Sequence, residues 1–320
     1  MQLLYRAGMQ LCSRCGGDRV VYHRVYSNER LCRACFIETF ERRVVRTIGR
    51  YNMLRRDDRI AVAVSGGKDS LALLHVLWKI EKRFPEARLF AVTVDEGIED
   101  YREEAVRYAV EYANKLGVDV YVVSFRQLYG FDLQEVMETS EYRGLGLQAC
   151  SVCGVLRRKA INYAAKQLGA TVIATAHTLD DIVQTYFMNI LRGDLKRVEI
   201  GLRREEDGAI PRVTPFRLTP EREVVFYAYL MKIPFQASVC PNASQAMRDP
   251  IRKFLMEYDE KYPGSLYAAL KSFEKILPAQ DKEFTQRRCR VCGEPSSKEI
   301  CRGCELLTFI QRGAVCGGMS

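Results

Sequence analysis

Four short runs of the chain are almost continuously apolar and rich in β-branched residues, at residues 59–65, 87–95, 118–125 and 171–177. Strands of a parallel sheet have this pattern when both faces are covered, because neither face meets water. Amphipathic segments with helical spacing accompany these runs, at residues 70–82, 98–116, 156–168 and 179–191. Strands and helices that alternate in this way predict an α/β fold with a doubly wound, mostly parallel sheet.

The segment after the last predicted strand adds a loop and two helices. Residues 200–212 are polar and include Gly and Pro, which is typical of a loop. Thr219, Pro220 and Glu221 then supply an N-cap, a proline at the first helical position and a first-turn acid, so we expect a helix to about residue 231. A further helix is predicted over residues 244–258.

The two ends of the chain differ from this core in their cysteines. Each end carries two C-x2-C units close together, and the residues are Cys12, Cys15, Cys32, Cys35, Cys289, Cys292, Cys301 and Cys304. Four thiolates at such spacing form a tetrahedral site for which zinc is the natural ion. We predict a zinc module over residues 1–40, a basic linker helix over 41–58, a catalytic domain over 59–280 and a second zinc module over 281–320.

The net charge of +9 is concentrated at these two ends. Residues 1–59 contain 13 Arg against 6 acidic residues, which gives +7, and residues 282–320 contain 7 basic against 4 acidic residues, which gives +3. The middle has 29 basic and 30 acidic residues, which gives −1. A polyanion held by the ends and processed by the middle fits this distribution. Solvated surface charge and purely structural zinc modules are the plainer alternatives.

The chain shows no sequence feature of a membrane or exported protein. No apolar run is long enough to span a bilayer, and the first residues lack the layout of a signal peptide. We therefore expect a cytoplasmic protein that binds no membrane. Twelve cysteines in a reducing compartment favour metal or redox chemistry over a disulfide framework.

A first candidate site follows the first predicted strand. There the sequence SGGKDS leads directly into a helix, and it comprises Ser65, Gly66, Gly67, Lys68, Asp69 and Ser70. The glycines allow a tight turn whose amides face the same point as the helix N-terminus, which makes an anion site suited to phosphates. The spacing is not that of a Walker A loop. An ordinary turn between a strand and a helix is the alternative.

A second candidate site lies at the end of the fourth predicted strand. This strand ends at His177, and Asp180 and Asp181 open the next helix. The helix dipole stabilises acids in a first turn, so capping alone would explain them. In an open α/β sheet, however, the carboxyl ends of the strands form the ligand crevice, and SGGKDS lies at the same edge.

Three cysteines of the core form a third candidate site once the terminal modules and Cys316 of the tail are set aside. Cys150 and Cys153 form a C-x2-C unit, and Cys240 is distant in sequence. Thiolates are the usual ligands of iron–sulfur clusters, and three protein ligands would leave one iron open to a further ligand. A dithiol redox pair or persulfide carrier, and inert buried cysteines, remain alternatives.

SGGKDS resembles the PP-loop of the ATP-pyrophosphatase superfamily, whose members split ATP between the α- and β-phosphates and adenylate a substrate. The resemblance implies that residues 65–70 hold the released pyrophosphate and that Lys68 takes part in catalysis. It also implies that Ala63 lies beside the adenosine, and that Val94 in the stretch TVDEG grips the adenine through its backbone.

The stretches HTLDD, CSVCGVLRRKAIN and MNILRGD, followed by a Cys-Pro pair, are similar to the tRNA 2-thiouridine synthetases of the TtcA/TtuA family, in particular its TtuA-type branch. The likeness covers nearly the entire chain and includes both terminal modules. It implies that Asp181 is a catalytic or metal-positioning carboxylate and that Ala176 and His177 lie near the nucleotide. Relatives usually have Gly in place of Ala176.

In that branch three cysteines bind a [4Fe–4S] cluster whose free iron takes up sulfide, so the resemblance assigns Cys150, Cys153 and Cys240 as cluster ligands. Arg157 lies four residues after Cys153, where relatives often have a Lys that contacts ATP or the uridine. Because Arg stays charged and transfers no proton, we expect Arg157 to act as an electrostatic clamp.

The resemblance implies a complete reaction with its cofactors and partners. ATP with Mg²⁺ adenylates the C2 oxygen of a tRNA uridine, and sulfur then replaces this oxygen to give 2-thiouridine, AMP and pyrophosphate. The implied partners are tRNA, a ubiquitin-like sulfur carrier with a C-terminal thiocarboxylate, and a second copy of the chain in a homodimer.

The choice of uridine and two other classes of function stay open at this point. Residues 260–276 resemble the branch that acts on the T-loop ribothymidine, which is therefore the expected target, with the wobble uridine as the alternative. A cluster-free PP-loop tRNA ligase or amidotransferase has no use for three core cysteines. A zinc-ribbon RNA-binding protein with a degenerate nucleotide fold would not need an intact SGGKDS.

Overall fold

The computed structural model describes residues 11–139, 148–193, 209–242, 248–276 and 287–316. Most of the loop predicted at residues 200–212, and the start of the helix predicted at 244–258, lie outside these residues. The same holds for the end of the C-terminal tail.

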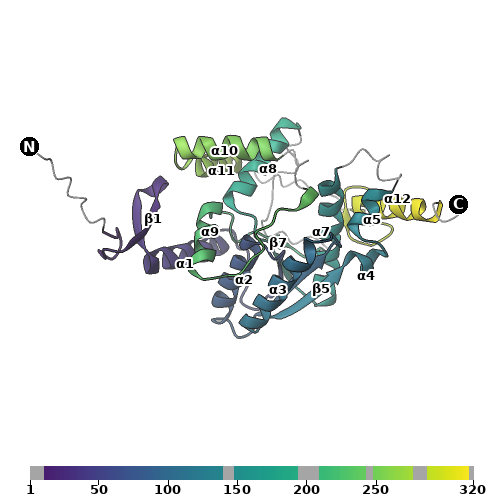
Figure 1. The fold of residues 1–320 in the computed structure, drawn as a ribbon, viewed down its shortest axis with the longest axis horizontal. Coiled ribbons are helices and arrows are strands. Elements are labelled where there is room, and N and C mark those ends of the chain that lie inside the picture. The colour runs from purple at the N-terminus through teal and green to yellow at the C-terminus, as the bar shows by residue number, and fades with distance from the viewer. Residues whose placement is uncertain (1–10, 140–147, 194–208, 243–247, 277–286, 317–320) are drawn as a thin grey trace, which may run out of the picture.

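A five-stranded parallel sheet occupies the centre of the molecule (Figure 1). Its strands lie in the order β5-β4-β3-β6-β7, and their bounds are β3 (Arg59–Ala63), β4 (Arg88–Asp95), β5 (Asp119–Ser124), β6 (Val172–Ala174) and β7 (Arg212–Val213). The four predicted strands and the doubly wound parallel sheet are thus confirmed. β7 escaped prediction because two residues are too few for a periodic pattern.

Both faces of this sheet are covered by helices. Ile60 and Val62 are fully buried in one core with α1 (Arg33–Arg50), α2 (Lys68–Glu81), α3 (Arg102–Leu116) and α9 (Glu221–Leu230). Ala61 points to the opposite face and is fully buried in a second core with α7 (Ala149–Gln167). Burial on both faces explains why the strands are continuous apolar runs in the sequence.

Helix bounds agree with prediction where the apolar pattern is periodic. α8 (Leu179–Leu191) has the predicted bounds, whereas α7 begins at Ala149 instead of residue 156. The extra turns contain Cys150 and Cys153, which interrupt the amphipathic pattern. α8 forms a third apolar core with α10 (Asp249–Lys261) and α11 (Ser265–Ile276), and two short helices, α4 (Phe125–Tyr129) and α5 (Leu133–Glu138), follow β5.

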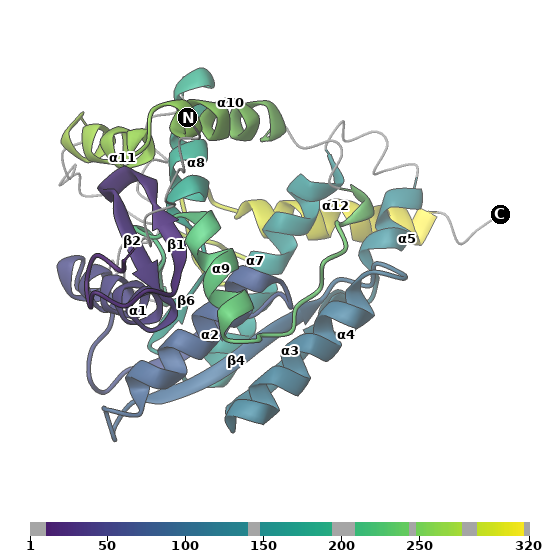
Figure 2. The same cartoon turned by 60° about the vertical axis from the view of Figure 1, so that its left-hand side comes forward.

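The two cysteine modules lie at opposite ends of the molecule (Figure 1). The N-terminal module contains β1 (Val20–Arg24), the short helix η1 (Val25–Ser27) and β2 (Glu29–Cys32), and it leads directly into the basic helix α1. The C-terminal module contains β8 (Arg287–Arg288), β9 (Pro295–Ser296) and α12 (Arg302–Cys316), and α12 lies beside α7 (Figure 2). Among the described helices, none combines the length and apolarity that crossing a bilayer requires.

A buried ion pair attaches the N-terminal module to the sheet domain. Arg24 of β1 donates to Glu223 of α9 at 2.9 Å, and these side chains are 3% and 0% exposed. Arg43 of α1 also lies 2.9 Å from the Glu223 carboxylate, and the hydroxyl of Tyr26 donates to it at 2.5 Å. The module is therefore packed against the domain that carries the candidate site.

Candidate nucleotide site and metal centres

A cavity of about 1000 Å³ opens at the carboxyl edge of the sheet. The strand order reverses here, because β3, β4 and β5 extend to one side and β6 and β7 to the other. Open α/β sheets bind their ligands at such a switch point. The cavity wall brings together the predicted residues Ala63, Ser65, Asp69, Ser70, Val94, Arg157, Ala176, His177 and Asp181. Gly66, Gly67 and Lys68 complete the loop beside it.

Gly66 determines the shape of the predicted phosphate loop. Its φ is +86°, and a Cβ at this position would lie 2.1 Å from the carbonyl oxygen of Ala105. The hydroxyl of Ser70 accepts a hydrogen bond from the amide of Ser65 at 3.0 Å and donates to the carbonyl of Gly67 at 2.9 Å. These bonds close the turn in front of α2, so the helix N-terminus borders the cavity as an anion site requires.

The charged residues of this loop are paired with each other and with α9. Nζ of Lys68 lies 3.0 Å from Oδ2 of Asp69 and 2.8 Å from Oε1 of Glu221. Burial raises the pKa of Asp69 to about 6, although the charge of Lys68 acts in the opposite direction. Oδ1 of Asp69 is buried and has no hydrogen-bond partner among the described residues. A carboxylate oxygen at the cavity wall is therefore left for a ligand.

Asp181 caps its helix and also lines the cavity, so both roles considered for it are compatible. Its Oδ2 accepts hydrogen bonds from the amide and hydroxyl of Thr178 at 3.0 and 3.1 Å, and its Oδ1 lies 3.3 Å from Nη1 of Arg248. Asp180 instead accepts a bond from the amide of Glu221 at 2.7 Å, and burial raises its pKa to about 6. The neighbouring acids thus have different surroundings.

His177 and Ala176 form the part of the cavity wall where β6 ends. Nδ1 of His177 lies 3.0 Å from the hydroxyl of Thr175. The side chain is exposed in the cavity, and partial desolvation by the protein groups around it lowers the pKa of His177. His177 is therefore a neutral hydrogen-bonding group at pH 7 rather than a cation.

Arg102 is a site residue that the sequence did not identify. It is 5% exposed, and it donates to the carbonyls of Ser65 and Val94, both at 2.6 Å. Arg102 thereby connects the phosphate loop to the end of β4, where Val94 is expected to contact the adenine. A single arginine in a basic chain has no distinguishing pattern, because its partners come from other segments. Arg248, which faces Asp181, was missed for the same reason.

The three core cysteines lie in one region of the structure. Cys150 and Cys153 are in the first turns of α7, and Cys240 is in the extended segment that follows α9. Sγ of Cys150 donates to the carbonyl of Asn242 at 3.1 Å, which joins α7 to this segment. Cys240 packs against the apolar core that contains Cys153.

The spacing and protonation of these cysteines distinguish among their candidate roles. Among the described residues, the ligand sets whose atoms all lie within 4.8 Å of one another are the two terminal four-cysteine sets, and the core cysteines are not among them. One zinc ion needs that closeness, whereas cluster thiolates bind different irons and stand farther apart. Burial raises the pKa of both Cys150 and Cys153, while a reactive redox pair has a lowered pKa. The raised pKa values of Cys150 and Cys153 differ from those of a reactive redox dithiol.

Comparison with known proteins supports the assignment of the phosphate loop. Residues 37–258 match the family ATP_bind_3, described as a PP-loop domain. The chain belongs to the PP-loop family. A probable sulfurtransferase of Methanocaldococcus jannaschii is 35% identical over 93% of this chain and 87% of its own length. The cytoplasmic tRNA 2-thiolation protein 1 of Chlamydomonas reinhardtii is 34% identical over 95% of this chain and 86% of its own length.

A solved structure resembles this PP-loop protein over most of its length. It is the U34-tRNA thiolase NcsA from Methanococcus maripaludis with its [4Fe–4S] cluster. The two chains are 30% identical, the TM-score is 0.81, and the likeness covers 94% of this chain and 96% of the other. This likeness confirms the predicted PP-loop fold over 94% of the chain.

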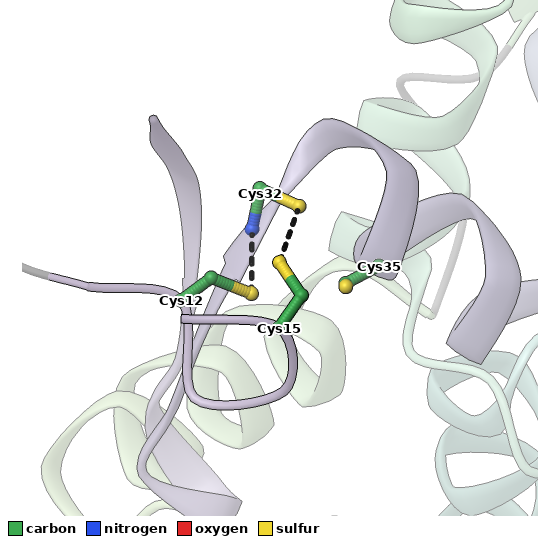
Figure 3. Close-up of side chains that lie close together, drawn as sticks. All are labelled: Cys12, Cys15, Cys32 and Cys35. Atoms are coloured by element: carbon green, nitrogen blue, oxygen red, sulfur yellow. Dashed lines mark hydrogen bonds between the residues drawn. The ribbon is translucent and has the colours of Figure 1, made fainter. Parts of the chain in front are cut away.

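The N-terminal module of the PP-loop protein gathers its four sulfur atoms within 4.8 Å of one another (Figure 3). The sulfurs of Cys15 and Cys32 are 3.7 Å apart. A tetrahedral site with zinc–sulfur bonds of about 2.3 Å has an edge of about 3.8 Å, so the module fits zinc. His23 forms a hydrogen bond with Asn28 at 3.1 Å and stays outside the ligand set.

The thiol of Cys12 ionises more readily than a free cysteine, which favours metal binding. Its burial opposes ionisation, but the backbone amides of Cys32, Cys15 and Arg14 stabilise the thiolate, and together they lower the pKa of Cys12 to about 6. The amide of Cys32 lies 3.4 Å from this sulfur. Amides that point at a sulfur are typical of structural zinc sites, since they offset the negative charge of four thiolates.

The C-terminal module has the same ligand geometry and also forms part of the cavity wall. Its four sulfurs lie within 4.8 Å of one another, and those of Cys292 and Cys301 are 3.7 Å apart. Cys292, Gly293, Glu294 and Pro295 line the cavity. Nζ of Lys159 on α7 lies 3.8 Å from the Glu294 carboxylate. The second module is thus joined to the helix that carries Cys150 and Cys153.

Proposed function

We propose that this PP-loop protein is a tRNA 2-thiolation enzyme that uses ATP to activate a uridine for replacement of its C2 oxygen by sulfur. The observation that carries the proposal is that the phosphate loop and the helix with the core cysteines border the same cavity. The phosphate loop borders a cavity whose wall also includes Gly154 and Arg157 of α7, the helix that carries Cys150 and Cys153. The names of the relatives and of the similar structure support the same activity.

In the proposed reaction the loop residues act on ATP. The amides of residues 65–70 and Lys68 bind the phosphates, and Ala63, Val94, Ala176 and His177 surround the nucleoside. Asp69 and Asp181 would hold Mg²⁺ beside the phosphates, because carboxylate oxygens are its preferred protein ligands. The C2 oxygen of the uridine attacks the α-phosphate of ATP, and pyrophosphate leaves. This oxygen, by itself a poor leaving group, is then part of AMP and leaves with it when sulfur is bonded to C2.

Cys150, Cys153 and Cys240 would hold a [4Fe–4S] cluster, in agreement with their location in one region and with the raised pKa values of Cys150 and Cys153. When bound by three thiolates, such a cluster offers an open iron position at which a sulfur ligand can be presented. The guanidinium of Arg157 donates to Sγ of Cys153 at 3.1 Å and also faces the cavity. Its fixed positive charge would stabilise the negative charge that develops on the activated uridine.

We propose the wobble uridine as the target, in place of the T-loop ribothymidine expected from residues 260–276. The relative from Chlamydomonas reinhardtii is named a cytoplasmic tRNA 2-thiolation protein, and the similar structure is a U34-tRNA thiolase, which supports this target. In this chain Leu266, Leu270 and Phe273 are buried in the core between α11 and α8. That segment is therefore constrained by packing, which explains why its sequence is a poor guide to the substrate.

The remaining expectations complete the proposal. One Zn²⁺ binds each terminal module, and the basic helix α1 beside the first module contacts the tRNA backbone. The functional units remain 1–40, 41–58, 59–280 and 281–320. The sulfur donor is a ubiquitin-like carrier with a C-terminal thiocarboxylate, and the enzyme acts as a cytoplasmic homodimer.

A thiolation assay tests the activity and its target together. Protein reconstituted with iron and sulfide is incubated with ATP, Mg²⁺, a thiocarboxylated carrier and unmodified tRNA, and position-resolved nucleoside analysis follows. We expect 2-thiouridine at the wobble position together with AMP and pyrophosphate. Sulfur found only in the T-loop would restore the first expectation, and absence of AMP formation would overturn the proposed reaction.

A cysteine variant separates the proposal from its cluster-free rivals. Cys240→Ala is compared with Cys316→Ala, which changes a cysteine outside the proposed set. We expect Cys240→Ala to lose bound iron and at least about 10²-fold of the thiolation rate, while Cys316→Ala keeps both. A PP-loop ligase or amidotransferase would bind no iron in either variant, and its ATP cleavage would be insensitive to Cys240→Ala.

A further inference from the structure

Glu96 is a buried carboxylate that the proposed reaction does not use. It follows the last residue of β4 and is 1% exposed. Its position is fixed by its neighbours, because its carbonyl accepts the amide of Leu133 at 2.9 Å. Gly97 then turns away with a φ of +67°, where a Cβ would lie 2.5 Å from the side chain of Asp132. The local backbone therefore holds the Glu96 carboxylate inside the domain.

On one side Glu96 binds the arginine that organises the nucleotide site. Nε of Arg102 lies 2.7 Å from Oε2 of Glu96. The same guanidinium donates to the carbonyls of Ser65 and Val94 at 2.6 Å and to the hydroxyl of Thr93 at 3.0 Å. Loss of the Glu96 charge would leave this buried cation without its counter-ion and would loosen the loop that holds the phosphates.

On the other side Glu96 binds the arginine beside the cysteines. Oε1 of Glu96 forms an ion pair with Nε of Arg157. Nη2 of Arg157 donates to Sγ of Cys153 at 3.1 Å. The position of the guanidinium at the sulfur thus depends on the same carboxylate that holds Arg102.

The contacts form one continuous chain from the phosphate loop to the cysteine. It runs from the Ser65 carbonyl through Arg102, Glu96 and Arg157 to the Cys153 sulfur. One carboxylate serves two guanidinium groups, so movement of either cation changes the interaction available to the other. Spatial continuity alone does not establish energetic coupling, which needs a measured dependence of one site on the other.

We propose that Glu96 is a positioning residue that couples nucleotide binding at the phosphate loop to the environment of Cys153. The inference rests on the proposed function in that it treats the loop as the ATP site and Cys153 as part of the sulfur-handling site. When ATP binds and the loop at Ser65 tightens, Arg102 shifts. The Glu96 carboxylate moves with Arg102, and the position of Arg157 changes in turn. By linkage, a change at Cys153 alters nucleotide affinity by the same factor.

A double-mutant cycle on nucleotide binding tests this coupling. The dissociation constant of α,β-methylene-ATP is measured by calorimetry for full-length wild type, Cys153→Ala, Glu96→Gln and the double variant, all zinc-loaded and free of iron. We expect Glu96→Gln to weaken binding roughly tenfold, because it removes the carboxylate charge from two ion pairs that position the site. Cys153→Ala should change the affinity at least about threefold in the wild-type background and not in the Glu96→Gln background.

Two matched variants control for general effects. Cys316→Ala removes a cysteine outside the proposed ligand set. Glu99→Gln removes an exposed carboxylate three residues beyond Glu96. We expect both to bind the nucleotide within about twofold of wild type, since neither belongs to the chain of contacts.

The outcomes are decisive in either direction. Equal effects of Cys153→Ala in both backgrounds, or no effect in the wild-type background, overturn the proposal. If Glu96→Gln does not fold, as judged by zinc content and circular dichroism, Glu96→Asp replaces it. This variant keeps the charge but is one methylene shorter, so it should diminish the Cys153→Ala effect, and an undiminished effect overturns the proposal. Because the cycle needs neither tRNA nor iron, its failure is separate from failure of the thiolation assay.

Discussion

The ammonium group of Lys68 lies 2.8 Å from the carboxylate of Glu221, so the lysine of the phosphate loop is bound to the first residue of α9. Glu221 also accepts a hydrogen bond from Arg252 at 3.1 Å, and its backbone amide donates to Asp180. An incoming phosphate therefore meets a lysine whose charge is already partly neutralised. Nucleotide binding has to replace or share this carboxylate.

Glu221→Gln is expected to lower the KM for ATP. The substitution removes a negative charge near the phosphates and frees Lys68, which should strengthen binding roughly threefold to tenfold at low salt. ATP–pyrophosphate exchange measures the change, and the gain should shrink as ionic strength rises. An increase in KM would indicate that Glu221 positions Lys68 for the phosphates instead of competing with them.

Asp181→Asn is expected to lower the rate of uridine activation about 10²-fold, because the charge of a carboxylate in the cavity is lost. Its stability should change by less than about 1 kcal/mol, since the amide oxygen of Asn still caps the helix through Thr178. Asp180→Asn is the matched control, because Asp180 binds the amide of Glu221 and does not line the cavity. Equal losses of activity in the two variants would contradict a specific role for Asp181.

Asp69 gives the stability of the protein a pH dependence. Its pKa is raised by burial from 3.8 to about 6, so in this range the folded state binds more protons than the unfolded state. Stability therefore falls as pH rises from about 4 to about 6, and the loss persists above pH 6. Asp69→Asn should remove this loss, which amounts to at most roughly 3 kcal/mol at about 1.4 kcal/mol per pKa unit.

Urea unfolding at pH 4.5 and pH 7.5 checks this prediction. The gain in stability of Asp69→Asn over wild type should be larger at pH 7.5 than at pH 4.5. The exposed Asp119→Asn is measured in parallel to subtract the general effect of removing a carboxyl group. A gain that is equal at the two pH values would show that Asp69 ionises in the folded protein as it does in the unfolded chain.

Arg24→Ala is expected to destabilise the protein by roughly 3 kcal/mol, because it leaves the buried carboxylate of Glu223 with less compensation. Arg43 still faces this carboxylate, which keeps the loss near the lower end of the usual range. Arg14→Ala is the control, since Arg14 forms an exposed pair with Glu29 and should cost less than about 1 kcal/mol. Similar losses in thermal unfolding for both variants would contradict the role of the buried pair.

Zinc removal should affect the two modules differently. Cys15→Ser and Cys292→Ser are each expected to lose one zinc ion per chain, measured by elemental analysis. Cys292→Ser should also raise the KM for ATP several-fold, since Cys292 and its neighbours line the cavity. Cys15→Ser should leave this KM within about twofold of wild type. An unchanged KM in Cys292→Ser would mean that the second module only folds the C-terminus.

The strands, the phosphate loop and the cysteine pairs could be predicted because each depends on residues close together in the sequence. β3 reads as a strand since Ile60, Ala61 and Val62 are buried on both faces. SGGKDS predicts a phosphate site because its turn places Gly66 at a φ of +86°, which favours glycine, although the close approach of Ala105 appears only in the structure. The spacing within each pair of C-x2-C units likewise determines its ligand geometry without reference to the rest of the chain.

Other features escaped prediction for physical reasons. The start of α7 was placed too late because Cys150 and Cys153 break the apolar periodicity of its first turns. Residues 260–276 carry limited information about the target uridine, because Leu266 and Phe273 in that segment are buried against α8.

The sequence by itself determined the fold class and the terminal zinc-ligand sets, because short-range periodicity and spacing specify which elements and metal geometries are available, and the resemblance of its motifs indicated the family. Only the tertiary structure decided which side chains cooperate. Arg24 meets Glu223, Lys68 meets Glu221, and Glu96 joins the nucleotide loop to Cys153 through Arg102 and Arg157. These pairings depend on where separate segments meet when the cores close, and the burial of Arg24, Glu223, Glu96 and Arg102 away from water makes the charge on each partner matter to the other.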